Sequence, residues 1–119
     1  MNYIARNNIG DVMLGKIVKV IVDRPIGSHH PNHEDIIYRV NYGYVEGIIA
    51  SDGEEQDAYI LGIDQPINEY TGKIIAIVHR LDDIEDKWIV APEDVNFTKE
   101  EIIKQIEFQE QFFKYEIIM

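Results

Sequence analysis

Two kinds of hydrophobic periodicity divide the chain and predict a β-rich body followed by one helix. In the first part, short β-branched stretches alternate with polar positions and are separated by Gly, Pro, Asn and Asp. This pattern is typical of strands joined by turns in a small all-β barrel or sandwich. We therefore expect strands over residues 16–23, 36–40, 44–50, 56–63, 73–80 and 87–91. Between them, the segments rich in Gly, Pro and Asn are predicted to be loops, at residues 25–35 and 64–71.

The C-terminal part has the spacing of an amphipathic helix. Thr98 and Glu101 form a capping-box pattern, in which each side chain can bond the backbone amide of the other. Apolar residues then recur at helical intervals, at positions 102, 103, 106, 112 and 113. We expect a helix over about 99–115, packed on a barrel over about 15–92, within a single domain spanning residues 1–119.

Composition narrows the function classes. The 119 residues suffice for one modest core, and the absence of cysteine excludes thiol catalysis, thiolate metal sites and disulfides. A formal charge of −11 argues against nucleic acid or an anionic membrane as the main partner. The N-terminus lacks a secretory pattern, and no apolar run approaches the ~20 residues of a membrane span. We expect a cytoplasmic protein. The oligomeric state stays open, and a homo-oligomer is one alternative.

Three carboxylates crowd the turn that follows an aromatic and glycine-rich stretch. Asp52, Glu54 and Asp57 are spaced i, i+2 and i+5. Carboxylates this close repel one another unless solvent, cations or a proton relieve the charge. Mg²⁺ prefers such oxygen ligands, so the turn is a candidate metal site. An acidic, solvated hairpin turn is the alternative.

The same stretch resembles the signature of the soluble (family I) inorganic pyrophosphatases. Residues 41–44 read Asn-Tyr-Gly-Tyr, and the acidic turn matches the family's Asp-Gly-Asp-Pro-x-Asp without a gap. Asp52 and Asp57 fall on the first and last signature aspartates, and Glu54 replaces the middle one. The family's two prolines are replaced here by Glu46 and Glu55. The resemblance implies a mainly β fold, a small five-stranded OB-like barrel with a C-terminal α-helix packed on it.

A second acidic cluster precedes a predicted apolar strand. Four acids between two strands are usually a solvated turn, but the family carries an Asp…Asp-x-Lys segment before such a strand. The chain fits that segment with one residue deleted before the lysine and one before Asp86. The resemblance then implies that Asp86 completes the metal shell of Asp52 and Asp57, and that Asp82 serves a further metal. Asp83 is an equal alternative to Asp82.

The implied chemistry is hydrolysis of diphosphate, or of a related phosphoanhydride, with Mg²⁺ (Mn²⁺ as an alternative). Bound divalent ions can neutralise the substrate and lower the pKa of a bridging water. Glu54 is the candidate that orients or deprotonates this water, although its extra methylene shifts the carboxylate relative to aspartate. Tyr42 falls on the signature tyrosine that touches substrate phosphate. We therefore count Glu54 and Tyr42 as catalytic candidates.

Cations should hold the phosphates, and the resemblance offers several. Lys87 follows from the second acidic segment. Lys19 fits one register of the early strand, and Arg24 fits another through a Val-Asp-Arg match; both stay open. On the predicted helix, Phe112-Phe113-Lys114-Tyr115 resembles the family's Phe-Phe-x-x-Tyr-Lys, so Tyr115 falls on the family's tyrosine, although the lysine after it is replaced by Glu116.

The sequence also supports two alternative functions. The signature departures also fit a weakened or inactive relative that serves as a metal- and phosphate-ligand binding module. A third hypothesis is a transition-metal site on the histidine-rich segment, because imidazoles suit zinc or nickel. Its candidate ligands are His29, His30 and His33.

Overall fold

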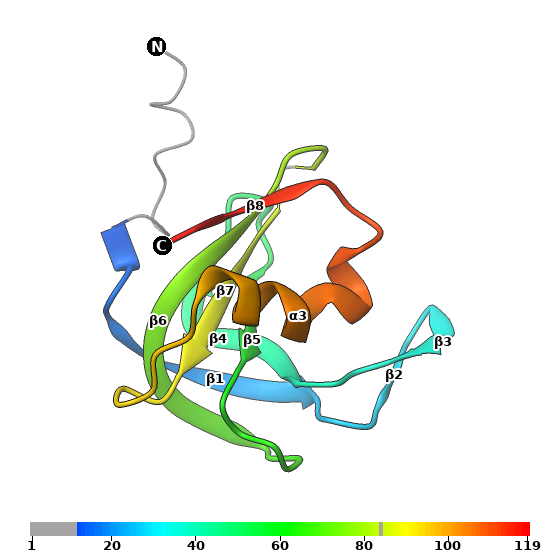
Figure 1. The fold of residues 1–119 in the computed structure, drawn as a ribbon, viewed down its shortest axis with the longest axis horizontal. Helices are drawn as coiled ribbons and strands as arrows, with labels where there is room; N and C mark the ends of the chain where they lie inside the picture. The colour runs from blue at the N-terminus through cyan, green and yellow to red at the C-terminus, as the bar shows by residue number, and fades with distance from the viewer. Residues whose placement is uncertain (1–11, 84) are drawn as a thin grey trace.

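The computed structural model describes residues 12–83 and 85–119, and it is built around a closed five-stranded β-barrel (Figure 1). In order around the wall, the strands are β1 (Ile17–Arg24), β4 (Asn41–Ile49), β5 (Glu55–Ile60), β7 (Asp86–Ala91) and β6 (Glu69–Arg80). Antiparallel pairing of β1 with β6 closes the barrel. The pair β5–β7 is parallel, and the other barrel pairs are antiparallel. The prediction of a mainly β, OB-like barrel with a C-terminal helix is confirmed.

Three further features are attached to the barrel. Strands β2 (His29–His30) and β3 (His33–Ile37) form a hairpin that projects from one side (Figure 1). Helix α3 (Lys99–Glu110) lies against the barrel wall, and β8 (Tyr115–Ile118) pairs with β6. Within the described part of the chain, no helix has the length and apolar character needed to cross a membrane.

Two apolar layers hold these elements together. The barrel interior is filled by Val20, Val45, Ala58, Ile60, Ile74, Ile77, Trp88 and Val90. The second layer lies between the wall and α3 and contains Tyr38, Tyr42, Tyr59, Leu61, Ile89, Ile102 and Ile106. Because successive side chains of a strand point to opposite faces, β7 contributes to both layers and is buried along almost its whole length.

The helix begins where the sequence predicts and ends earlier. The capping box is present: the Thr98 hydroxyl accepts from the Glu101 amide at 3.1 Å, and the Glu101 carboxylate accepts from the Thr98 amide at 2.8 Å. The helix ends at Glu110, so the predicted extension to residue 115 was wrong. Tyr115 lies in β8 because pairing with β6 gives the backbone a different set of hydrogen-bond partners.

Strand boundaries also differ from the prediction. The segment 25–35, predicted as a loop, contains β2 and most of β3, while the strand predicted at 36–40 ends at Ile37. β6 starts at Glu69, inside the predicted loop 64–71, because its first residues pair with β1. The missed strands arise where strand pairing overrides turn-forming composition, within the local hairpin for β2 and β3 and with the distant β1 for the start of β6.

A close approach of β1 and β4 brings two candidate residues together. A Cβ at Gly43 would lie 1.8 Å from the Ile21 carbonyl oxygen, so only glycine fits this signature position. Beyond it, the register shifts between Val22 and Arg24, as in a β-bulge. The shift pairs Arg24 with Tyr42.

Candidate functional site

Three residues predicted from the sequence meet on the outer face of the barrel, near α3. The Lys87 Nζ donates to Asp57 Oδ2 at 2.6 Å and to the Tyr42 hydroxyl at 2.9 Å. They come from adjacent strands: Tyr42 from β4, Asp57 from β5 and Lys87 from β7. Tyr42 and Lys87 are buried, and Asp57 is about one-third exposed. The cluster therefore has one side open to solvent.

The phenol of Tyr42 stays neutral. Burial raises its pKa well above the ordinary value, and the nearby Asp57 carboxylate raises it further. The hydroxyl oxygen can therefore accept from Lys87, and its proton is directed to Asp57, whose hydrogen bond is among the causes of the raised pKa.

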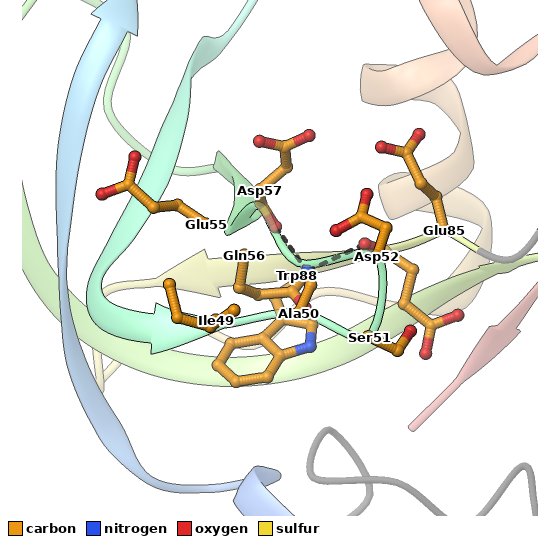
Figure 2. Close-up of a pocket in the computed structure, with 10 residues that line it drawn as sticks. Ile49, Ala50, Ser51, Asp52, Glu55, Gln56, Asp57, Glu85 and Trp88 are labelled. Atoms are coloured by element: carbon orange, nitrogen blue, oxygen red, sulfur yellow. Dashed lines mark hydrogen bonds between the residues drawn. The ribbon is translucent and has the colours of Figure 1, made fainter.

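Beside this cluster is a pocket rich in carboxylates. Asp52, Asp57 and Glu85 lie on one side of it, and the Trp88 ring lies on the other (Figure 2). Its full lining is Ile49, Ala50, Ser51, Asp52, Glu55, Gln56, Asp57, Glu85, Asp86 and Trp88. The structure thus places Asp52 and Asp57 at one pocket, as the signature match implied.

Gln56 fixes the floor of this pocket. Its side-chain amide donates to the backbone carbonyls of Asp57 at 3.0 Å and of Asp86 at 2.8 Å (Figure 2). The two acidic segments are therefore held together across the β5–β7 pair.

Asp86 lines the same pocket as its predicted partners Asp52 and Asp57, but strand alternation turns its side chain away from Lys87. The Asp86 carboxylate lies 2.8 Å from His79 Nδ1, across the β6–β7 pair, whereas Lys87 points to the opposite face. Glu85 is the acid that reaches Lys87, with its Oε1 3.3 Å from the Lys87 Nζ. Sequence reasoning missed Glu85, although it stands two residues before the lysine, where the family motif Asp-x-Lys has its acid.

The structure also distinguishes the two candidate cations of β1. Arg24 lies 5.3 Å from the centre of the Tyr42 ring and donates to the Tyr38 hydroxyl at 2.7 Å. Lys19 is 40% exposed and lies near Glu69 and Glu46, at 3.6 and 4.0 Å. Arg24 therefore belongs to the Tyr42 cluster by geometry, and Lys19 lies outside it.

Other predicted site residues lie apart from the pocket lining. Asp82 is exposed and accepts from the Lys114 amide at 3.4 Å, while Asp83 accepts from the Glu85 amide at 3.3 Å. Glu54 is exposed in the turn, and its amide donates to Asp52 Oδ1 at 3.0 Å. Tyr115 donates to the Glu107 carboxylate on α3 at 2.7 Å. Burial is the main cause that raises the pKa of Tyr115, and this hydrogen bond is the second.

The histidine-rich segment carries local hydrogen bonds. His29 Nδ1 lies 2.6 Å from the Glu34 carbonyl oxygen, and His30 Nδ1 accepts from the Asn32 amide at 3.0 Å. Across residues 12–83 and 85–119, no three His, Asp or Glu side chains are arranged to hold a metal ion, either here or at the carboxylate pocket. The pocket's donors are nevertheless hard oxygens, the type that Mg²⁺ takes.

A buried polar chain connects the helix to the barrel. Tyr38 donates to Gln109 Oε1 at 2.6 Å, and the Gln109 amide donates to the Tyr59 hydroxyl at 2.7 Å. Tyr59 in turn donates to Glu110 at 2.6 Å, and burial together with the Glu110 charge raises the Tyr59 pKa well above its usual range. Local sequence patterns do not reveal this series of hydrogen bonds, because it joins residues far apart in the sequence.

Comparison with known proteins places the fold. No protein-family model matches the chain, and no curated protein sequence matches it significantly. Among solved structures, the inorganic pyrophosphatase of Ehrlichia chaffeensis is similar with a TM-score of 0.65 at 14% identity, over 87% of this chain and 85% of that one. The Helicobacter pylori inorganic pyrophosphatase gives 0.62 at 15% identity, over 86% and 84%. That of Neisseria gonorrhoeae gives 0.56 at 21% identity, over 85% and 78%. The chain therefore shares the fold of these inorganic pyrophosphatases.

Proposed function

We propose that this protein is a divergent inorganic pyrophosphatase-like hydrolase that converts diphosphate to two phosphates with Mg²⁺. The observation that carries the proposal is the contact of Lys87 with both Asp57 and Tyr42, at 2.6 and 2.9 Å. These residues come from three separate segments, each singled out by its resemblance to the family. The shared fold supports the same activity.

The cations and the phenol are assigned to the substrate. Arg24 and Lys87 flank the Tyr42 ring, with Arg24 Cζ 5.3 Å and Lys87 Nζ 5.6 Å from its centre. Two positive groups beside one ring suit an anion with several phosphate oxygens. Tyr42, kept neutral by burial, can turn its O–H hydrogen bond from Asp57 to one of these oxygens.

The carboxylates are assigned to the metal. Asp52, Asp57 and Glu85 offer oxygen donors at one pocket, and Asp86 also lines it while bonded to His79. When bound, Mg²⁺ supplies charge neutralisation and a more acidic water. The chain's own contribution is to gather the donors, through Gln56, at the edge of the Tyr42 cluster.

The group that orients the attacking water has two candidates. Glu54 is the sequence-based choice, and Glu85, which lines the pocket, is the second candidate, a role that is an alternative to holding the metal. Separate Glu54→Gln and Glu85→Gln variants distinguish them, because the variant that lowers kcat without raising KM removes an interaction of the transition state.

The direct test is phosphate release from diphosphate by tag-free protein, with Mg²⁺ and then with EDTA. We expect release that EDTA abolishes, and a loss of about a hundredfold or more in Asp57→Asn, because misplacing catalytic groups has effects of this size. Asp94→Asn removes an exposed carboxylate elsewhere and is the matched control. Unchanged turnover in Asp57→Asn contradicts the site assignment.

A binding module is the second candidate function. It is favoured by the signature substitutions Glu46, Glu54 and Glu55. Diphosphate binding that needs Mg²⁺ but gives no phosphate would assign the protein to this class.

A further inference from the structure

A buried ion pair lies between the barrel and the helix, close to the candidate site. Glu110 of α3 is completely buried, and its carboxylate accepts from Arg80 Nε at 3.0 Å, from Arg80 Nη2 at 2.8 Å and from Tyr59. A buried carboxylate is tolerated only when its charge and hydrogen bonds are satisfied. This two-point contact fixes the plane of the guanidinium.

The remaining nitrogen of that guanidinium reaches the site. Arg80 Nη1 donates to Glu85 Oε1 at 3.2 Å, and the same oxygen lies 3.3 Å from the Lys87 Nζ. The Phe113 ring covers the guanidinium, with its centre 3.6 Å from Cζ. Glu85 is therefore held between two cations, one of which is locked by the helix.

We propose that Arg80, held by Glu110, is a positioning residue for the candidate site. It fixes Glu85, and through Glu85 it holds the Lys87 ammonium against Asp57 and Tyr42. The bonds from Nε and Nη2 hold Arg80 to the helix, whereas Nη1 contacts Glu85 at the site. The inference rests on the proposed function for what the site binds, but the positioning itself can be measured without metal or substrate.

The test is Arg80→Lys, which keeps the charge but replaces a rigid fork by one ammonium that cannot span Glu110 and Glu85. In metal-free protein, we expect the ¹⁵N signal of the Lys87 ammonium and the ¹³C carboxyl signal of Glu85 to shift. Ile106→Val is the matched control, because it perturbs the same interface without touching the polar groups. Signals that remain unchanged in folded Arg80→Lys would overturn the proposal.

A second readout uses Trp88, the only tryptophan, which lines the carboxylate pocket. We expect the Mn²⁺ concentration that half-quenches Trp88 fluorescence to rise about tenfold in Arg80→Lys, the size typical of losing an outer partner of a metal ligand. If the unaltered protein shows no Mn²⁺ response, the metal assignment fails, and the metal-free signals still decide the positioning.

Glu85→Gln covers the case in which Arg80→Lys does not fold, because it leaves the Arg80–Glu110 pair intact. We expect it to shift the Lys87 signal as well, and an unchanged signal overturns the proposal. Where both variants fold, their effects on Lys87 should be non-additive, since Arg80 acts through Glu85. Additive shifts would show an independent route and contradict the inference.

Discussion

His30 lies near both cations assigned to the substrate. Its ring stacks on that of Tyr38 with centroids 6.2 Å apart, and the Tyr38 hydroxyl accepts from Arg24. Burial, followed by the positive charges of Arg24, His33 and Lys87, lowers the pKa of His30 below the ordinary value of 6.5. His30 is therefore neutral at pH 7 and adds no charge to the site.

This shift gives a prediction for pH titration by NMR. His30 should titrate below pH 6.5, and Arg24→Gln should raise its pKa, because a positive charge is removed. A lowered folded-state pKa stabilises the fold above pH 6.5, and this contribution is lost as the pH falls. Lys99→Gln, which removes an exposed charge at the start of α3, should leave the titration unchanged. Titration above 6.5, or no response to Arg24→Gln, would contradict the prediction.

At the residue scale, the sequence predicts the centre of the site better than its edge. Tyr42 and Asp57 follow from a gap-free signature, and the structure brings them to Lys87. Glu85 was missed because the motif match was made by residue type: it chose Asp86 because the family has an aspartate there, and it ignored strand alternation. Alternation puts residues i and i+2 on one face, which groups Glu85 with Lys87 and places the Asp86 side chain on the opposite face, against His79.

Helix α3 combines a local start signal with an end that depends on tertiary structure. The capping box can be read from the sequence because its partners are three residues apart. The end at Glu110 cannot, because the following residues pair with β6, which is distant in the sequence. The start of β6 was missed for the same reason, since its first residues pair with β1, whereas β3 pairs with the neighbouring β2 in a local hairpin.

The capping box makes a prediction for stability. Thr98→Ala should lower the free energy of unfolding by about 1 kcal/mol, because the Glu101 amide loses its acceptor. Urea denaturation measures this change. Thr98→Ser retains a hydroxyl and should cost only a few tenths of a kcal/mol. Equal losses in the two variants would show that the methyl group, rather than the cap, carries the effect.

At the scale of the whole molecule, the charge of −11 and the carboxylate pocket should favour cation binding. The effect of Mg²⁺ on stability therefore tests the site. A ligand that binds only the folded state raises its stability, by about 2.7 kcal/mol at a hundredfold excess over Kd. We expect Mg²⁺ to raise Tm and EDTA to reverse the change. Asp57→Asn should remove most of the effect.

General screening of the negative surface is the competing explanation, and NaCl at equal ionic strength controls for it. A rise in Tm equal to that with Mg²⁺ would assign the effect to screening.

The overall architecture was predictable because it rests on pattern rather than on detail. Period-two stretches followed by a capped amphipathic segment give strands and then a helix, and the signature resemblance implies the barrel. Barrel closure through β1 and β6, and the polar chain through Gln109 and Glu110, depend on which distant segments meet. Local hydrophobic periodicity carries no information about such long-range contacts.

Barrel closure has a consequence for the time course of folding. The strand pair that closes the barrel joins Ile17 to Lys73, and the bond from Tyr38 to Gln109 spans 71 residues. Such non-local topologies fold in milliseconds to seconds rather than microseconds. The helix can lock Arg80 only after the wall that carries Arg80 has formed. The site should therefore be among the last parts of the molecule to become ordered.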